Sequence, residues 1–285
     1  MMTGAGAGDK PRILMCPPDH FEIAYAINPW MDEGVPFSRD LARRQWDALV
    51  AAITGPGGAA VCLMDAVEGL PDLVFTANAA FVSGNQAIVA RYRHAERQGE
   101  ESFVAAWFEE NGFEVIRLPD ALYFEGAGDA LIWRNPDGLY PDRCLVFAGY
   151  RTRTAIASHS LISTHLGLPV LSLELMHEAF YHVDVCLCPL QGGYLLYAPE
   201  SFDEYGNAVI EANVPPDKRI TVAMADARRF ACNAVNLGET VILNQGSTAV
   251  ETALSDRGFR VIPLDMSEFI KAGGSAKCLT LRLNP

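Results

Sequence analysis

Apolar residues along this chain recur in short runs separated by polar turns. Runs such as QAIVARY and CLVFAGY are typical of strands, whereas FVAAWFEENG and AIASHSLISTHLG have helical length and spacing. Ser102 can cap one of these helices, and Gly112, Gly167 and Gly258 each follow a helical stretch as C-caps do. The pattern therefore predicts a mixed α/β protein with short strands.

The order of the predicted elements repeats along the chain. A strand with an unexpected polar residue leads to a second apolar strand, a helix and a third strand. Four such units begin at residues 73, 124, 181 and 231. The first unit is split, because RILMCPP, a helix over about residues 38–53 and AAVCLMDA come early, while CLTLRL at the far end supplies the missing strand.

Five such units that close on themselves predict a five-bladed α/β propeller, with the leading strands around a central polar channel and the helices outside. An open α/β sheet is the alternative, and it would leave the repeated polar residues without a common destination. Residues 1–11 are predicted to be a disordered tail. No linker divides residues 12–285, which we expect to form a single catalytic domain.

Composition narrows the class of protein. The formal net charge of −13 argues against binding to nucleic acid or to an anionic membrane and favours a cationic small molecule. The chain has no signal-peptide pattern and no apolar run of transmembrane length, so we expect a cytoplasmic protein. The seven cysteines are best interpreted as reduced thiols. Whether the protein forms a homo-oligomer stays open.

Polar residues recur at one position of the repeat. Asn78, Glu125 with Asp129, His182 with Asp184, and Asn233 lie in successive leading strands, with steps of 47, 57 and 51 residues between Asn78, Glu125, His182 and Asn233. Equivalent strands of a closed repeat would aim these groups at one axis. Five separate structural networks are the alternative, but buried carboxylates cost several kcal/mol unless they are paired or receive a ligand.

The residue types suggest nucleophilic chemistry on a cationic carbon. Cys278 follows Gly273 and Gly274 and adjoins Lys277, where a thiol could be pushed toward thiolate, although a buried small residue at the start of a strand is the simpler interpretation. A guanidinium is planar and charged, and two carboxylates can grip it. Cys278 would attack its carbon, His182 would act as acid and base, and Glu125 and Asp184 would hold the substrate or orient the histidine.

A carboxylate-bearing substrate would need cationic partners as well. Arg97 and Arg153 are our choices among several arginines in predicted loops after strands, although surface arginines are common. No metal and no other cofactor is needed for this chemistry, and we expect none. Cys186 and Cys188 form a C-x-C without a second such pair, so core packing explains them more simply than zinc does.

At this point the chain resembles the guanidine-modifying, or pentein, superfamily, which includes arginine deiminase, dimethylarginine dimethylaminohydrolase, amidinotransferases and arginine dihydrolase. The stretches that carry the likeness span residues 12–283 and include LMCPPDHFEIAYAINPWM, DLVFTANAAFV, ERQGEE, FEGAGDAL, FYHVDVCLCPL, ACNAVNLG and FIKAGGSAKCLTLRL. The likeness is strongest to the arginine dihydrolase group. The resemblance implies a five-bladed propeller and a covalent amidino-thiol intermediate.

The resemblance also implies roles for individual residues. Cys278 would be the nucleophile, His182 the acid and base, and Glu125 their carboxylate partner. Asp184 would bind the guanidinium, with Asp129 grouped among the substrate-binding residues. The resemblance further implies that Asn28, Arg97 and Arg153 meet the amino-acid end of the substrate.

Asn78 is the position that distinguishes members of the superfamily. Deiminases usually have an acidic residue there, whereas FTANA carries an amide, as in the dihydrolase group. We hypothesise that the amide holds the ureido product less firmly for release and permits a second attack, which would give ornithine, carbon dioxide and ammonia instead of citrulline.

The residues leave four functional hypotheses open. The leading prediction is an arginine dihydrolase. Dimethylarginine dimethylaminohydrolase or arginine deiminase activity, which would give citrulline, is the first alternative, and amidino transfer to an amine is the second. The third is a non-catalytic protein that binds arginine-like ligands, although a mere binder would have no use for the nucleophile.

Overall fold

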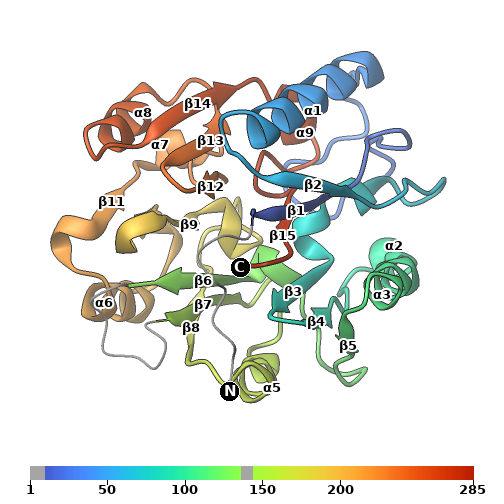
Figure 1. The fold of residues 1–285 in the computed structure, drawn as a ribbon, viewed down its shortest axis with the longest axis horizontal. Helices are drawn as coiled ribbons and strands as arrows, with labels where there is room; N and C mark the ends of the chain where they lie inside the picture. The colour runs from blue at the N-terminus through green and yellow to red at the C-terminus, as the bar shows by residue number, and fades with distance from the viewer. Residues whose placement is uncertain (1–9, 136–143) are drawn as a thin grey trace.

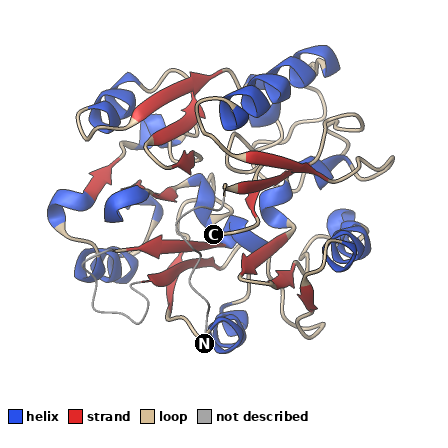
Figure 2. Ribbon diagram, in the orientation of Figure 1, coloured by secondary structure: helices blue, strands red, loops and turns tan. Residues whose placement is uncertain are grey.

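The computed structural model describes residues 10–135 and 144–285. Within these ranges the strands form five three-stranded sheets, arranged around a centre with the helices outside (Figures 1 and 2). The predicted five-bladed α/β propeller is confirmed. Of the predicted tail, residues 1–9 lie outside the described part, while the carbonyls of Lys10 and Pro11 accept hydrogen bonds from Asn284 and Ala60.

The five sheets share one pairing pattern. In each, the first strand pairs antiparallel with the second, and the second pairs parallel with the third. The sheets are β15 (Leu281–Arg282), β1 (Arg12–Met15) and β2 (Ala60–Leu63); β3 (Ala80–Ser83), β4 (Gln86–Val89) and β5 (Glu114–Ile116); β6 (Ala130–Arg134), β7 (Cys144–Tyr150) and β8 (Val170–Glu174); β9 (Leu187–Pro189), β10 (Leu195–Tyr197) and β11 (Arg219–Thr221); β12 (Val235–Leu237), β13 (Thr240–Asn244) and β14 (Arg260–Leu264).

The first sheet closes the ring. Strand β15, which lies near the C-terminal end, pairs with β1, so that Leu281 faces Leu14. This is the split unit that the sequence predicts. It brings Cys278, three residues before β15, next to the start of the chain and beside the other four inner strands.

Helices cover the outside of each sheet because their apolar faces match the strands. In α1 (Arg39–Thr54), Ala42, Trp46, Leu49 and Ile53 are buried at helical spacing, and Ser38 caps the helix by accepting a hydrogen bond from the backbone of Leu41. The other covering helices are α3 (Glu100–Glu110), α5 (Ile156–Leu166), α6 (Glu204–Asn213) and α8 (Thr248–Ser255), and shorter helices are α2 (Ala95–Gln98), α4 (Gly126–Asp129), α7 (Met224–Ala227) and α9 (Ser267–Ile270).

The middle strand of each sheet forms the core. Leu14, Ile88, Phe147, Leu196 and Ile242 are all fully buried in these strands. Burying a side chain of this size stabilises the fold by about 1.5–3 kcal/mol, so repeated buried strands support the ring.

Local predictions of helix ends are only partly right. Gly167 ends α5 in a left-handed conformation with φ of 64°, as its position predicts. Ser102, however, lies inside α3, which begins at Glu100 after Gly99. The prediction was wrong because the short helix α2 runs directly into α3 and leaves no extended residue for a serine cap.

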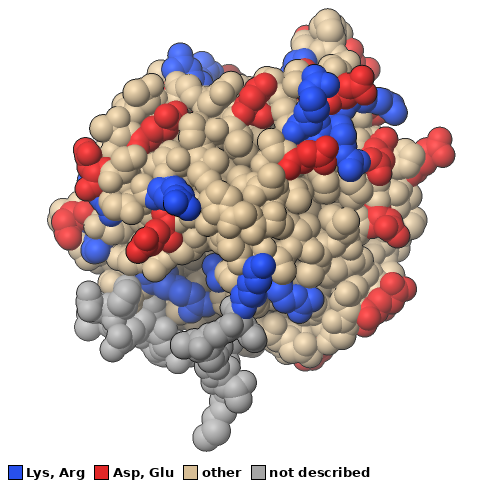
Figure 3. Space-filling view, turned by 45° about the horizontal axis from the view of Figure 1, so that its top comes forward, with Lys and Arg blue, Asp and Glu red and all other residues tan. Residues whose placement is uncertain are grey.

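The surface carries both signs of charge. In Figure 3, acidic and basic side chains are interspersed over the visible face. Within residues 10–135 and 144–285, no helix has the length and apolar character needed to cross a bilayer.

Candidate functional site

The recurrent polar residues converge, but they lie in turns instead of strands. Asn78 is the last residue of the 3₁₀ turn Thr76–Asn78, Glu125 precedes α4, and Asp184 lies in the 3₁₀ turn Val183–Val185 after His182. Each turn leads directly into an inner strand. The prediction that the leading strands themselves carry these residues was therefore wrong, because the backbone turns before each strand begins.

Glycines make the close approach of these turns possible. Gly126 has a φ of 60°, and a Cβ there would lie 2.7 Å from the carbonyl oxygen of Asn78. A Cβ on Gly128 would collide with the amide nitrogen of Asn78 and lie 3.4 Å from the ring of His182. The FEGAGDAL motif thus allows two turns from different blades to meet.

Cys278 lies buried against Asn233 and Asp184. The Asn233 amide nitrogen is 3.1 Å from the Cys278 sulfur, and its oxygen accepts hydrogen bonds from the backbone of Lys277 and Cys278. The sulfur is 3.6 Å from Oδ2 of Asp184. Asn233 therefore fixes the loop that carries the thiol.

The environment of Cys278 keeps its thiol protonated. Burial and the neighbouring Asp184 raise the pKa of Cys278 well above its usual range, and the opposing effect of Lys277 is smaller. The prediction that Lys277 pushes this thiol toward thiolate was wrong for the free protein, because desolvation and the Asp184 carboxylate outweigh the ammonium.

Asp184 is a buried carboxylate with one distant cationic partner among the described residues. Its Oδ2 lies 3.9 Å from Nζ of Lys277, beyond ordinary hydrogen-bond distance. Burial raises the pKa of Asp184 to about 6, against the lowering effect of Lys277. A cation placed beside Asp184 would relieve this cost.

Glu125 is instead fully paired. Its Oε2 accepts hydrogen bonds at 2.9 Å from Arg153 and at 2.7 Å from Nε2 of His182. Burial alone would raise the pKa of Glu125, but Arg153 and His182 together hold it below its usual range. Glu125 is therefore an anion that orients the imidazole.

The hydrogen-bond network fixes the tautomer of His182. The Asn78 oxygen accepts from NH1 of Arg97 at 2.8 Å, so its amide nitrogen is the group that faces Nδ1 of His182 at 3.4 Å. That amide can only donate, so Nδ1 is an acceptor and Nε2 carries the proton donated to Glu125. Burial lowers the pKa of His182 to about 4, against the opposing effect of Glu125, so the ring is neutral near pH 7.

Both predicted arginines lie in the cluster, paired with protein carboxylates. Arg97 is bound by Glu100 at 2.7 Å, and Arg153 also donates to the carbonyl of Ile27. The prediction that Arg97 lies in a loop was wrong, because this residue is in the short helix α2. The helical backbone places the Glu100 side chain, three residues later in the sequence, next to the Arg97 guanidinium. In this structure the two guanidiniums hold Asn78 and Glu125 in place.

Asp129 and Asn28 have supporting contacts. Asp129 accepts from the Thr154 hydroxyl at 2.7 Å and from the backbone nitrogen of Val183 at 3.0 Å, which anchors the turn after His182. Burial raises the pKa of Asp129 well above its usual range. Asn28 donates to the carbonyl of Ala272 at 3.1 Å, in the loop before Cys278.

The cysteine and the histidine belong to one cluster through shared neighbours. Asp184, in the turn after His182, contacts the Cys278 sulfur, and the backbone nitrogen of Ala77 donates to the Cys278 carbonyl at 3.1 Å next to Asn78. Sequence reasoning noticed that Asn233 converges with the others but gave it no role. Its position immediately before an inner strand, like that of Asn78, is the signal that could have assigned it.

Comparisons with known proteins agree with this geometry. The family described as N,N dimethylarginine dimethylhydrolase, eukaryotic, matches residues 26–284. The chain is 49% identical over 96% of its length to the bifunctional arginine dihydrolase/ornithine cyclodeaminase ArgZ of Synechocystis sp., and spans 38% of that protein. It is also 38% identical to the N(G),N(G)-dimethylarginine dimethylaminohydrolase of Mycobacterium tuberculosis, over 96% of this chain and 86% of the relative.

The crystal structure of the substrate-bound N-terminal domain of ArgZ, described as an arginine dihydrolase from the ornithine-ammonia cycle in Cyanobacteria, superimposes with a TM-score of 0.91 at 48% identity. The match covers 96% of this chain and 98% of that one. A dimethylarginine dimethylaminohydrolase structure shares the fold, with a TM-score of 0.78 at 21% identity. With its five-bladed ring and its buried cluster of polar residues, this chain belongs to the dimethylarginine dimethylaminohydrolase family within the guanidine-modifying superfamily.

Proposed function

We propose that this protein is an arginine dihydrolase, which converts arginine and two waters into ornithine, carbon dioxide and two ammonia molecules. The observation that carries the proposal is a buried thiol at 3.6 Å from an incompletely neutralised carboxylate, in the same cluster as a neutral imidazole. The 49% identity to ArgZ supports arginine as the substrate.

Substrate binding would activate the nucleophile. A guanidinium beside Asp184 supplies the positive charge that this carboxylate lacks, and the same charge stabilises the Cys278 thiolate. In the free protein, burial and Asp184 raise the pKa of the thiol, and a bound guanidinium would oppose both effects. Cys278 would be ionised chiefly in the complex.

The first half of the reaction would replace one nitrogen of the guanidinium by oxygen in two successive substitutions at its carbon. The Cys278 sulfur attacks the guanidinium carbon, and the tetrahedral adduct expels ammonia to leave an amidino group on sulfur. Nδ1 of His182, which lacks a proton in the free protein, can take one from the thiol and return it to the departing ammonia. The same nitrogen then accepts a proton from water as the water attacks the amidino carbon, and the carbon–sulfur bond breaks, which gives the ureido product and returns the proton to the Cys278 sulfur.

The second half would repeat the attack on the ureido carbon. Cys278 displaces ornithine and keeps a carbamoyl group, which water releases as carbamate, and carbamate decomposes to carbon dioxide and ammonia. We infer that Asn78 permits this step. Its amide has no negative charge, and its orientation is held by Arg97 at 2.8 Å.

Product analysis tests the function. Purified protein is incubated separately with arginine, asymmetric dimethylarginine and agmatine, and ammonia, citrulline and ornithine are quantified. We expect ornithine from arginine, with two ammonia molecules for each ornithine. Citrulline as the final product would instead indicate a deiminase, and dimethylamine would indicate a dimethylaminohydrolase.

Covalent labelling tests the nucleophile independently. A haloacetamidine carries the cationic amidine and a leaving group, so it should alkylate Cys278 selectively, and mass spectrometry locates the adduct. Labelling spread evenly over the seven cysteines would contradict the assignment of Cys278. Added arginine should protect Cys278 alone.

A further inference from the structure

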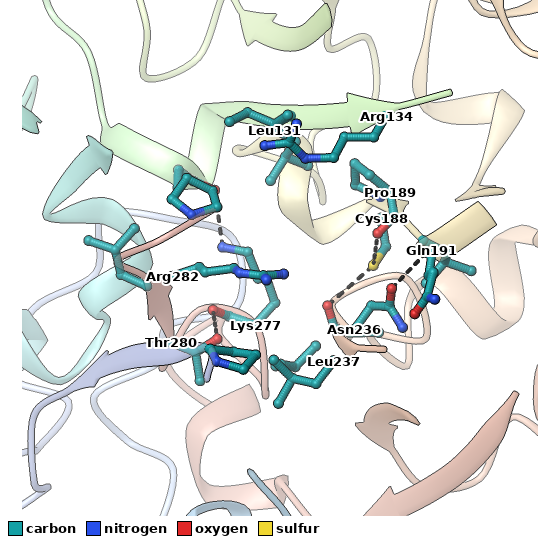
Figure 4. Close-up of a pocket in the computed structure, with 18 of the residues that line it drawn as sticks. Leu131, Arg134, Cys188, Pro189, Gln191, Asn236, Leu237, Lys277, Thr280 and Arg282 are labelled. Atoms are coloured by element: carbon teal, nitrogen blue, oxygen red, sulfur yellow. Dashed lines mark hydrogen bonds between the residues drawn. The ribbon is translucent and has the colours of Figure 1, made fainter. Parts of the chain in front are cut away.

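A cavity of ≈ 590 Å³ opens at the end of the inner strands opposite to the candidate site (Figure 4). The catalytic candidates precede the inner strands, whereas the cavity is lined mainly by the strands and by the turns that follow them, although Ala127, Ala234 and Lys277, which precede three of the strands, also reach it. Its volume lies within the range of small-molecule sites, about 300–1,000 Å³. We call it the channel cavity, and the lining residues that matter below are Leu131, Arg134, Leu187, Leu237, Lys277 and Arg282.

The charge of the channel cavity is opposite to that of the whole chain. Arg134, Lys277 and Arg282 line it, and none of its described lining residues is Asp or Glu. The chain as a whole has a net charge of −13. In Figure 4, Arg282 and Lys277 lie on one side of the cavity, and Arg134 reaches toward it from another. Three cationic side chains, with no Asp or Glu among the described lining residues, favour an anionic ligand in an otherwise acidic protein.

The two guanidiniums have only neutral partners within the described residues. NH1 of Arg134 contacts the sulfur of Cys144 at 2.7 Å, and Nε of Arg282 donates to the carbonyl of Asn284 at 3.1 Å. Burial lowers the pKa of Arg282, and Arg134 lowers it further, as expected when two cations face each other. An anion between them would remove this repulsion.

The apolar walls of the channel cavity favour a ligand with an apolar body. Leu131, Leu187 and Leu237, contributed by three different blades, line the same cavity as the two guanidiniums. A fully hydrated inorganic anion would leave these side chains uncovered. An organic acid would cover them and neutralise the rim.

We propose that the channel cavity binds a small organic acid, whose carboxylate is held by Arg134 and Arg282 and whose apolar body lies against the leucines. Lys277 connects this site to the other end of the channel. Its ammonium donates to the carbonyl of Ala127 at 3.2 Å and is 3.9 Å from Asp184. The bound acid therefore competes with Asp184 for the same cation.

Binding is measured by titration calorimetry on the full chain without guanidine substrate, so the result does not depend on the proposed function. The probes are 4-phenylbutyrate, 4-phenylbutylamine and sulfate. We expect 4-phenylbutyrate to bind, and the double variant Arg134→Gln, Arg282→Gln to weaken its binding at least about tenfold, since two charge-assisted contacts are lost. The double variant Arg134→Lys, Arg282→Lys keeps both charges and should retain most of the affinity.

The matched control is Arg117→Gln, which removes an exposed arginine paired with Glu109 far from the lining residues. This control should bind 4-phenylbutyrate like the parent protein. Three results would overturn the proposal: no binding of 4-phenylbutyrate at millimolar concentration, equal binding of the amine or of sulfate, or unchanged affinity in the glutamine double variant. Thermal unfolding of each variant verifies that it is folded.

Discussion

The two ends of the central channel are built by the same five inner strands and yet have opposite chemistry. At the end where the strands begin, the buried Glu125 accepts hydrogen bonds from Arg153 and His182, and the buried Asp184 lies beside the Cys278 thiol. At the end where they finish, Arg134 and Arg282 line a cavity that has no Asp or Glu among its described lining residues. The comparison teaches that a repeated fold gives two convergence points, and that the turn residues on each side decide what each can bind.

The largest difference between the two ends should be the loss of kcat when a cysteine at each end is replaced by alanine. Cys278→Ala removes the proposed nucleophile and should lower kcat by about 10⁴-fold or more, as losses of nucleophiles do in other enzymes. The matched change is Cys188→Ala, in a cysteine that lines the channel cavity. It should keep turnover and cost about 1 kcal/mol in the free energy of unfolding. Similar loss of kcat in both variants would contradict the division of the channel.

The second largest effect should come from breaking a buried ion pair of the candidate site, compared with an exposed ion pair elsewhere. Glu125→Gln leaves the Arg153 guanidinium uncompensated in the interior and should reduce the free energy of unfolding by about 3–5 kcal/mol. It should also slow turnover, since His182 loses its anionic partner. Glu174→Gln breaks an exposed pair with Arg151 and should cost about 0–1 kcal/mol. Urea unfolding of the two variants provides the measurement.

The pH dependence of kcat/KM should report Asp184 in the free protein. Its raised pKa of about 6 means that the carboxyl takes up a proton as the pH falls through 6, and the guanidinium then loses its anionic partner. We expect kcat/KM to fall about tenfold per pH unit below that midpoint. Asp184→Asn should abolish this limb of the profile, whereas a limb that persists in the variant would exclude Asp184 as its source.

The effect of Asn78 should be smaller and qualitative. Asn78→Asp replaces the amide that faces Nδ1 of His182 with a carboxylate, at almost unchanged size. The new anion should raise the pKa of His182 and shift the products from ornithine toward citrulline. Both are measurable, by the pH profile and by amino-acid analysis. An unchanged citrulline-to-ornithine ratio would remove Asn78 as the determinant of the second attack.

The smallest expected effect is a shift of the pH profile at the candidate site when a ligand binds in the channel cavity. Saturating 4-phenylbutyrate should draw the Lys277 ammonium away from Asp184, and the pKa of Asp184 should rise. The acidic limb of kcat/KM should therefore move to higher pH, by no more than about one unit, because the Lys277 contact is long and partly solvated. Profiles recorded with and without the acid test this, and a downward shift would contradict the coupling through Lys277.

The element order and the closure of the ring could be predicted because they depend on local patterns. Each apolar run is long enough for one strand, and each helix shows its own apolar spacing. The sequence therefore predicted that RILM and the C-terminal CLTLRL belong to one blade, as the pairing of β1 with β15 confirms. The polar residues could be found because a buried carboxylate between apolar neighbours needs an explanation.

The ionisation of those residues could not be predicted from the sequence. Lys277 is adjacent to Cys278 in the chain, which suggested a lowered thiol pKa, but Asp184, 94 residues away in the sequence, lies 3.6 Å from the sulfur and together with burial raises that pKa. Likewise Arg97 and Arg153 were predicted to meet a substrate carboxylate from loops after strands, and nothing in the sequence indicated that they are buried against Glu100 and Glu125. Electrostatic energy depends on distance and desolvation, and neither follows from sequence spacing.

The sequence by itself determined the five-fold repeat and the residue types that meet at its axis, because these follow from hydrophobic spacing along each segment. Only the tertiary structure decided which nitrogen of His182 carries the proton, which carboxylate stays poorly neutralised, and that a cationic cavity lies at the far end of the same strands. These properties arise between blades, where residues from distant parts of the chain exclude water together.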